Sequence, residues 1–301
     1  MNSLRVSAAT ATALGLRQWK VDVSPTTLYL MLGERCRGAC RYCTQGHGHL
    51  SRVRWPPMSL DEVLRSLPGQ HGARRLCLQT LFYDGVVDDV VRVAELLAGP
   101  LPLSVSMNPT TPENLERLRA AGVERVGIGL DCCSQALFYR LKHGVPSWDA
   151  YWEGLQGAAE VFGGATAHLI IGLGENDREA VETMQRLQEM SVDSALFAYF
   201  PLRRDRPPPL ARYRALQAAR HLVSTGRGHF IFDSRGRLEH LEGPLGPAAF
   251  ETSGCPFCNR PFYTERAGGP LYNYPRPLTA QEYKNAVKEV YHYVGPAAVA
   301  E

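Results

Sequence analysis

The strongest constraint on how this chain can fold is a regular alternation of strand-like and helix-like stretches between residue 28 and about residue 233. Helix-like segments, such as residues 86–97, 177–190 and 210–224, separate short apolar runs. Because strands joined through helices run parallel, and right-handed crossovers let a parallel sheet curl, this order predicts an α/β fold with a partial (β/α)6-type TIM barrel. The expected strands are residues 28–32, 74–80, 101–107, 123–130, 165–171 and 195–200, with a last short one at 229–233.

A flat, doubly wound parallel sheet is the alternative architecture for the same alternation. Its nucleotide-binding form carries a GxGxxG turn after the first strand. Here the first strand is followed by the cysteine-bearing run CRGACRYC, so the sequence favours the barrel. In a barrel the chemistry gathers at the C-terminal ends of the strands, which is where this run falls.

Length and charge exclude several classes of protein. The 301 residues are enough for one barrel of about 250 residues. With 33 basic and 30 acidic residues the net charge is +3, too even for a nucleic-acid groove. No apolar run approaches ~18 residues, and the first 20 residues lack the apolar segment of an export signal, so we expect neither a membrane span nor export. Cysteine clusters in such a chain indicate metal sites in a reducing cytoplasm.

The sequence divides into three expected parts. Residues 1–27 form an N-terminal helix or arm, residues 28–242 the barrel, and residues 243–301 a cysteine-bearing extension. From about residue 243 the composition shifts to Gly, Pro, Asn, Tyr and Arg without a clear period, so we expect this extension to pack on the barrel. Thr279, with Glu282 three residues later, predicts the start of a closing helix over residues 278–293.

Three cysteines, Cys36, Cys40 and Cys43, are spaced CxxxCxxC directly after the first strand. A cubane iron–sulfur cluster has four irons that usually take thiolate ligands, so three cysteines leave one iron open to a small molecule. A thiol–disulfide motif needs only two cysteines, and zinc sites usually show paired CxxC or Cys/His sets. The alternative is a zinc knuckle completed by His47 or His49.

This spacing, the preceding strand and the aromatic Tyr42 resemble the radical S-adenosylmethionine (radical SAM) superfamily. The resemblance implies that Cys36, Cys40 and Cys43 are catalytic residues that hold a [4Fe-4S] cluster, whose open iron binds S-adenosylmethionine. Reduction of such a cluster cleaves the sulfonium and releases a 5′-deoxyadenosyl radical, which takes hydrogen from unactivated carbon. Tyr42 is then expected to pack on the adenine, the alternative being a core aromatic residue beside the cluster.

The same resemblance assigns residues at two further strand ends to the cofactor. The run after the fifth strand is similar to an IxGxGE-like turn of enzymes such as biotin synthase. Its residues Gly172, Gly174 and Glu175 are expected to hold either the adenosine or the strand–helix turn itself. Gln79 and Thr80 end the second strand, where family members contact the methionyl amino group.

The end of the fourth strand gives the remaining cofactor candidates. Asp131, followed by Ser134, resembles the family segment in which an acid and later polar residues face the cofactor. Lys142, on the helix that follows, can reach the methionyl carboxylate, although a lone lysine on a helix is more often solvated.

A second metal-site signal lies in the run CPFCNRPFYTER. Cys255 and Cys258 form a CxxC on a proline-bearing turn, which converges two thiolates on one metal, and we favour an auxiliary [4Fe-4S] cluster over zinc. Two thiolates do not complete such a site. Cys132 and Cys133, at the C-terminal end of the fourth strand, are the first candidates to complete it. Cys77 on the second strand is the next, although a single strand cysteine is usually a small buried hydrophobic residue.

Two enzyme families share features with the chain. Residues 28–175 are similar to the core of biotin synthase, but its second cluster is not reproduced, because the third and fifth strands carry no cysteine. The C-terminal CPxCNRPxxxER, followed by GGPLYNYP, resembles a subunit of the two-protein lipoyl synthase. The positions that replace cysteines in the two strands are Ser104, Ser106, Thr166 and His168.

The lipoyl synthase resemblance implies insertion of sulfur from the auxiliary cluster at C6 or C8 of an octanoyl chain carried on a protein lysine. It implies three partners, namely a second radical SAM subunit, the octanoylated lipoyl carrier protein and an electron donor such as ferredoxin or flavodoxin. Polar residues of the motif become candidates for contact with the auxiliary cluster or the substrate, or else they cap turns. They are Asn259, Arg260, Arg266 and Asn273.

Two alternative functions stay open at this point. One is another radical SAM enzyme in which the C-terminal cluster conducts electrons or anchors the substrate. The other is a non-catalytic iron–sulfur or zinc protein.

Overall fold

The computed structural model describes residues 3–44, 53–69, 71–99, 101–201, 205–260, 263, 265 and 269–295. Six parallel strands form its centre, and the predicted partial (β/α)6-type TIM barrel is confirmed. These strands are β2 (Thr27–Leu32), β4 (Arg75–Thr80), β5 (Leu103–Met107), β6 (Val123–Asp131), β7 (Ala165–Ile171) and β8 (Val192–Ala198).

Two further strands extend the sheet beyond β2, and the sequence did not indicate them. β1 (Ser3–Val6) pairs antiparallel with β2, and β3 (Pro57–Ser59) pairs antiparallel with β1. The full order is β3-β1-β2-β4-β5-β6-β7-β8. The first 27 residues therefore contribute a strand to the sheet as well as the short helix α1 (Ala8–Ala13).

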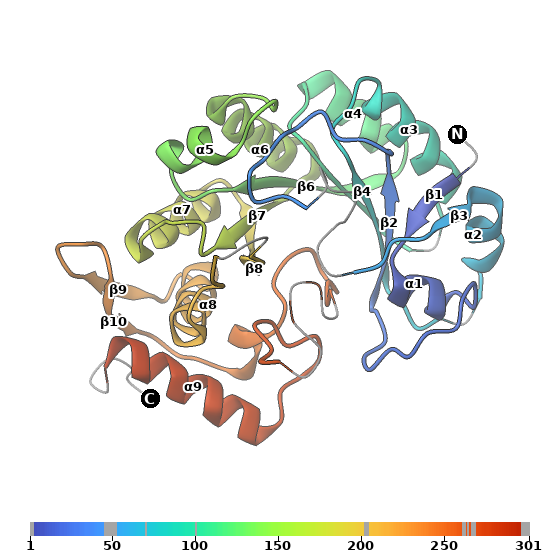
Figure 1. Cartoon of the computed structure of the whole chain (residues 1–301). Helices are drawn as coiled ribbons and strands as arrows, with labels where there is room; N and C mark the ends of the chain where they lie inside the picture. The colour runs from blue at the N-terminus through green and yellow to red at the C-terminus, as the bar shows by residue number, and fades with distance from the viewer. Residues whose placement is uncertain are drawn as a thin grey trace.

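Helices cover the outer face of the curved sheet (Figure 1). Several helices begin and end at the predicted residues, among them α3 (Val86–Leu97) and α8 (Leu210–Ser224). The stretch between β6 and β7 holds two helices, α5 and α6. The helices of the barrel are α2 (Leu60–Ser66), α3 (Val86–Leu97), α4 (Pro112–Ala120), α5 (Gln135–Leu141), α6 (Trp148–Phe162), α7 (Asp177–Glu189) and α8 (Leu210–Ser224).

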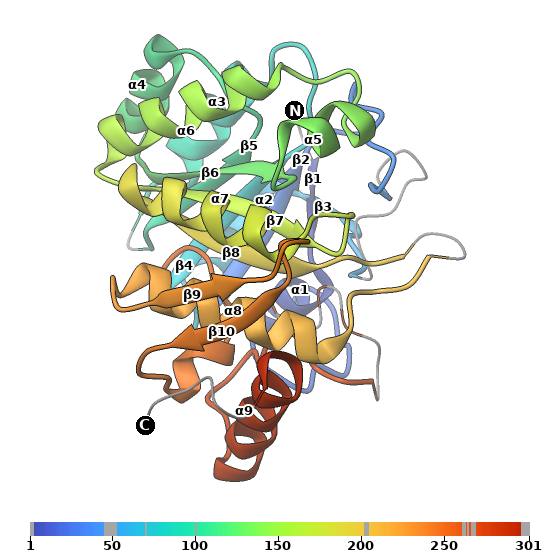
Figure 2. The ribbon, with the colours of Figure 1, turned by 90° about the vertical axis from the view of Figure 1, so that its left-hand side faces the viewer.

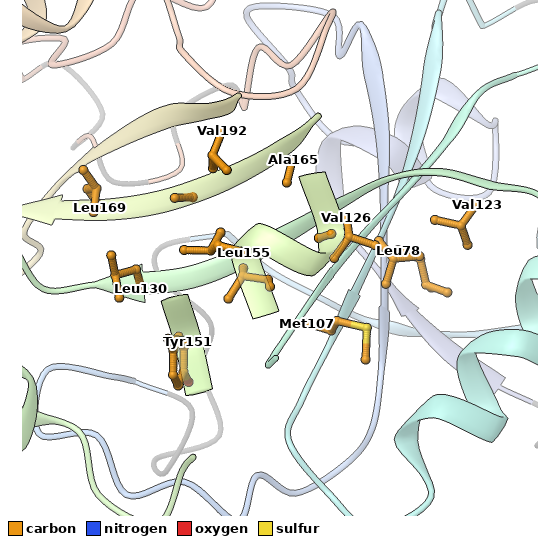
Figure 3. Packing of buried hydrophobic residues seen from close by; sticks show 14 of the residues in the cluster. Leu78, Met107, Val123, Val126, Leu130, Tyr151, Leu155, Ala165, Leu169 and Val192 are labelled. Carbon is orange, nitrogen blue, oxygen red and sulfur yellow. The ribbon is translucent and has the colours of Figure 1, made fainter. Parts of the chain in front are cut away.

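Alternation along each parallel strand divides its side chains between two environments. In β2 the leucines Leu28, Leu30 and Leu32 are buried in the cluster under the helices, while Tyr29 and Met31 face the interior of the barrel. Because successive side chains of a strand point to opposite faces, one face builds the core and the other lines the cavity. Figure 3 shows part of this core, with side chains of α6 among those of the strands.

The chain after the barrel forms a second, smaller layer. The predicted strand at 229–233 is β9 (His229–Phe232), but it pairs only with β10 (Leu238–Glu242), outside the main sheet. The closing helix is α9 (Ala280–Val294), and it begins at the predicted cap, where Glu282 N donates to Thr279 Oγ1. Figure 2 shows α9 beside α8, at the end of the molecule away from α3 and α4.

Residues 251–260 lie between β8 and β2, across the open side of the incomplete barrel (Figure 1). Leu196 of β8 donates its N–H to Ser253 Oγ at 2.9 Å and accepts from the Arg260 guanidinium at 3.3 Å. On the other side, Arg260 N–H donates to the hydroxyl of Tyr29 in β2 at 2.8 Å. The extension thus completes the wall that six strands leave open.

None of the helices in the described part of the chain is long and apolar enough to cross a bilayer.

The buried Arg214 fastens the extension to α8 and gives a test of this packing. Its guanidinium donates to Gln217 Oε1 and Tyr272 O, both at 2.6 Å, and also to Leu271 O. We expect Arg214→Leu to lower the free energy of unfolding by about 2–4 kcal/mol in urea denaturation, since buried acceptors lose their donor. The control is Arg92→Leu, whose side chain is 65% exposed, and equal losses in both variants would contradict this role.

Candidate active site

A cavity of ≈ 270 Å³ occupies the barrel interior and joins the two cysteine-bearing segments. Its wall includes Cys43 of the CxxxCxxC loop together with Cys77 and the turn cysteines Cys255 and Cys258. None of the eight cysteines, all of which lie in the described part of the chain, forms a disulfide. The interior-facing residues of the strands form the rest of the wall, so the cavity is a direct product of the barrel.

The loop that carries Cys36, Cys40 and Cys43 is held by backbone hydrogen bonds at the C-terminal ends of the strands. Arg37 N–H donates to Phe82 O at 2.7 Å, and Ala39 N–H donates to His143 O at 2.8 Å. The close approach of Gly144 requires glycine, since a Cβ there would meet Arg37 O at 2.9 Å and the residue has φ of 67°. The alternative zinc ligands His47 and His49 lie outside the described residues.

Tyr42, Asp131 and Lys142 form one hydrogen-bonded group beside this loop. Tyr42 hydroxyl donates to Asp131 Oδ2 at 2.6 Å, and Lys142 Nζ donates to the same oxygen at 2.9 Å and to Gly129 O. Lys142 is not the solvated lysine of the alternative reading, because its side chain is only 3% exposed and lies over the ring of Tyr151 at 4.2 Å. Asp131 has φ of 63°, a left-handed conformation that is costly for a residue with a side chain.

The charges in this group are set by burial and pairing. Burial alone would lower the pKa of Lys142, but the carboxylate of Asp131 more than offsets this effect, and the pKa is raised. Burial raises the pKa of Tyr42, and the charge of Asp131 raises it further, so the phenol stays a neutral donor. The result is a buried ion pair in which Asp131 lines the cavity and Lys142 lies behind it, while Tyr42 donates to the same carboxylate oxygen.

The glycine-rich turn after β7 is held by its own acid. The carboxylate of Glu175 accepts backbone N–H groups of Gly172 at 2.8 Å, Leu173 at 3.0 Å and Gly174 at 3.2 Å. It also pairs with Arg212 at 3.0 Å, and its side chain is 1% exposed. Of the two roles predicted for Glu175, the structure shows it holding the strand–helix turn.

The same arginine ties this turn to the C-terminal layer. Arg212 Nε donates to Asp177 Oδ1 at 2.7 Å. The other oxygen of Asp177 accepts from Tyr293 hydroxyl at 2.7 Å and from Leu238 N–H at 2.8 Å. A single buried carboxylate therefore joins α7, α8, α9 and β10.

The remaining cofactor candidates divide by position. Gln79 and Thr80, at the end of β4, line the cavity as predicted for residues that face a bound molecule. Ser134 is instead the N-cap residue of α5 and is not part of the cavity wall.

The structure brings Cys77, Cys255 and Cys258 together. Cys77 is in register with Tyr29 of β2 and Ser104 of β5, and it faces the cavity. Burial raises the pKa of Cys77, and the neighbouring thiols Cys255 and Cys258 raise it further, whereas Arg260 and Arg75 act the other way. Three thiols from β4 and the extension thus share one site.

Two hydroxyl groups contact the sulfur atoms of the turn. Tyr29 hydroxyl lies 3.5 Å from Cys258 Sγ, and Thr166 Oγ1 lies 3.4 Å from Cys255 Sγ. The hydroxyl of Tyr29 also accepts the N–H of Arg260, so it links the backbone of the turn to the sulfur of Cys258. The sequence analysis did not select Tyr29. The alternation of β2 contains the signal, because Tyr29 and Met31 are two residues apart and so lie on the same, interior face of the strand.

Cys132 and Cys133 are placed elsewhere, and this corrects their selection as the first partners of the turn. Both are buried in the hydrophobic core and neither lines the cavity. Burial, followed by the charge of Asp131, raises the pKa of Cys132 to about 12. The carbonyl of Cys133 accepts from Thr183 of α7, which lies outside the barrel. The second-ranked candidate, Cys77, takes their place.

Arg260 and His168 face the cavity near the turn. The guanidinium of Arg260 stacks on the ring of Phe197 at 3.8 Å and lines the cavity. His168 packs edge-on against Phe197, and burial, helped by the charge of Arg260, lowers its pKa to about 4. Arg260 is therefore positioned for contact with a bound group, and His168 is a neutral imidazole in the wall.

The other polar candidates of the motif hold the backbone. Asn259 accepts from Thr26 N–H at 3.1 Å and donates to Ser24 O at 3.0 Å. Asn273 Oδ1 accepts from Tyr213 hydroxyl at 3.1 Å. These contacts correspond to the turn-capping alternative, and Arg266 lies outside the described residues.

The spacing of the thiols tests which metal group they fit. A single zinc with sulfur ligands at about 2.3 Å would bring the sulfurs to within about 4 Å of one another. In neither triplet, Cys36–Cys40–Cys43 nor Cys77–Cys255–Cys258, are the three sulfurs all within 4.8 Å of one another. Neither set is therefore drawn together as tightly as a single zinc ion would require.

Solved structures share the fold at low sequence identity. The [FeFe]-hydrogenase maturase HydG from Carboxydothermus hydrogenoformans is similar over 74% of this chain and 55% of its own, with a TM-score of 0.55 and 12% identity. Methylornithine synthase (PylB) covers 72% of this chain and 65% of its own, with a TM-score of 0.54 and 12% identity.

Curated relatives match about half of the chain rather than all of it. GTP 3′,8-cyclase of a Nostoc species is 28% identical over 181 residues, 55% of this chain and 52% of that protein. Biotin synthase of Aquifex aeolicus is 23% identical over 168 residues, 53% of this chain and 50% of that protein. The chain thus spans about half the length of these relatives. The Radical SAM superfamily model matches residues 30–187, just over half of the chain, and the protein belongs to this superfamily.

Proposed function

We propose that this radical SAM enzyme inserts sulfur into an octanoyl chain on a lipoyl carrier protein, as a subunit of a two-protein lipoyl synthase. One observation carries the proposal. A single cavity runs from Cys43 to a second set of three thiols, Cys77, Cys255 and Cys258. A substrate carbon in this cavity can therefore meet a radical source and a sulfur source without leaving the barrel.

The first site fits what the family implies. A [4Fe-4S] cluster on Cys36, Cys40 and Cys43 with bound S-adenosylmethionine would supply the 5′-deoxyadenosyl radical. Asp131 lines the cavity and offers a charge that suits the ammonium of an amino acid, and Lys142 holds that carboxylate from behind. Tyr42 orients the acid, and Gln79 and Thr80 face the same space.

The second site fits a donor of sulfide. Cys77, Cys255 and Cys258 would hold an auxiliary [4Fe-4S] cluster with one iron lacking a cysteine, so that the cluster is easier to dismantle. Arg260 contacts the same space and is the member of the motif set best placed to reach such a cluster.

The cavity between the sites suits an alkyl chain. Its wall carries apolar side chains, including Met31, Ile170 and Phe197. Apolar pockets with a few placed polar groups are typical of small-molecule and acyl sites. The proposed partners are the octanoylated carrier protein, a second radical SAM subunit and a ferredoxin or flavodoxin as reductant, all in the cytoplasm.

A second candidate function keeps both clusters but uses the inner one to conduct electrons or anchor the substrate. Arg75 and Arg260 favour it, because both cations counteract the raised pKa of Cys77 and Cys258. Such charges would also stabilise an anionic cluster that is reduced and reoxidised rather than consumed.

Mass spectrometry of an octanoyl-lysine peptide separates the two functions. After anaerobic reconstitution with labelled sulfide, the protein is incubated with S-adenosylmethionine, a reductant and the peptide, with and without its partner subunit. Sulfur insertion predicts labelled sulfur in the peptide and loss of sulfide from the protein. A cluster that stays intact while the peptide gains no sulfur would favour the electron-conducting role.

The two cysteine sets should fail in different ways. Cys40→Ala is expected to abolish cleavage of S-adenosylmethionine to 5′-deoxyadenosine, because it removes a ligand of the first cluster. Cys255→Ala should retain cleavage but form no product, as measured by chromatography of both reactions. Equal loss of cleavage in the two variants would rule out this division of labour.

Lys142→Met tests the charged group at the cavity wall. Loss of a charge-assisted hydrogen bond, worth about 1.5–3 kcal/mol, should weaken S-adenosylmethionine binding about 10- to 100-fold in calorimetry of reconstituted protein. Lys284→Met on the exposed face of α9 is the matched control. Unchanged affinity in the Lys142 variant would show that this lysine does not serve the cofactor.

A further inference from the structure

The Cys255–Cys258 turn borders a second hollow, on the side away from the barrel interior. This outer groove has a volume of ≈ 360 Å³. Cys255 and Cys258 line both the groove and the central cavity, whereas Cys77 lines only the cavity. The turn is therefore a thin partition between the groove and the cavity, and both of its cysteines belong to the two walls.

The turn is built under strain and is firmly anchored. Phe257 has φ of 66° and Arg260 has φ of 33°, conformations that cost a residue with a side chain of order 1 kcal/mol or more. Phe257 O accepts the hydroxyls of Thr26 at 2.6 Å and Thr27 at 2.8 Å, which fixes the turn to the start of β2. These hydrogen bonds keep the strained turn, and with it the two cysteines, in place.

Phe257 and Glu251 give the groove its character. The ring of Phe257 is 40% exposed and lies under the guanidinium of Arg74 at 3.7 Å, so it forms a flap at the groove. Glu251 lines the groove, and its carboxylate has no hydrogen-bond or ion-pair partner among the described residues. A carboxylate and two thiols in one groove suit ferrous iron. The carboxylate can bind the ion first through oxygen, and the thiols can then bind it through sulfur.

We infer that this groove is the entrance through which ferrous iron and sulfide reach the Cys77–Cys255–Cys258 site. The inference rests on the proposed function, because a cluster that loses sulfide has to be rebuilt. Under the proposed function the central cavity would hold the cofactor and the substrate, so a separate entrance would let the inner site be loaded while the cavity is filled. Each thiol that binds iron gives up its proton to solvent.

Thiol labelling of the metal-free protein tests the entrance directly. Pro277 is exposed and lines the groove, so Pro277→Trp should obstruct it, while Phe257→Ala should remove the flap. The control Gln281→Trp adds the same bulk at an exposed position that is not part of the groove wall. Peptide mass spectrometry would follow the reaction of Cys255 and Cys258 with a bulky charged maleimide.

We expect labelling to slow by about tenfold in Pro277→Trp and to speed up in Phe257→Ala, because thiol reactivity follows access. Rates of iron–sulfide absorbance growth, measured in a Cys36/Cys40/Cys43→Ala background with ferrous iron and sulfide, should change in the same direction. Urea denaturation shows whether each variant is folded. If Pro277→Trp does not fold, Phe257→Ala still tests the entrance.

Unchanged labelling and loading in both folded variants, relative to Gln281→Trp, would overturn the inference and place the entrance at the cavity mouth. The outcome is independent of sulfur insertion, because neither rate requires an octanoyl substrate. A working entrance in a protein that transfers no sulfur would therefore refute the proposed function alone, by showing a loaded site without the reaction.

Discussion

The structure depends on how an incomplete barrel closes. Six parallel strands leave an open side between β8 and β2, where the unpaired backbone of β8 would face solvent. Ser253 and Arg260 form hydrogen bonds with the backbone N–H and C=O of Leu196 in β8, and the backbone N–H of Arg260 donates to the hydroxyl of Tyr29 in β2. The segment that closes the wall is the segment that carries Cys255 and Cys258, so closure of the barrel and construction of the inner site are the same event.

Strand alternation explains why much of the fold was predictable. The barrel, most element bounds and the Thr279 cap follow from local patterns of apolar residues and caps that a sequence displays directly. β1, β3 and β10 were not predicted, because short edge strands depend on their partners rather than on their own pattern.

The site was predictable where its cysteines are close in sequence, and less so where they are distant. The CxxxCxxC loop and the CxxC turn were readable from spacing alone. The choice between Cys77 and the pair Cys132–Cys133 needed the face of each strand: Cys77 alternates with Leu76 and Leu78 and so faces inward, whereas Cys132 and Cys133 follow the end of β6 and turn into the core. Glu175 showed the same difficulty, since only the structure reveals that its own turn uses the whole carboxylate.

The carboxylate of Asp177 has a mechanical consequence. It receives hydrogen bonds from α8, α9 and the start of β10, while Arg212 also pairs with Glu175 in the turn after β7. A displacement of the last helix, for example by a protein that binds it, would be transmitted through Asp177 and the two ion pairs of Arg212 to the glycine-rich turn after β7. The last helix and the turn after β7 are therefore joined into one connected unit.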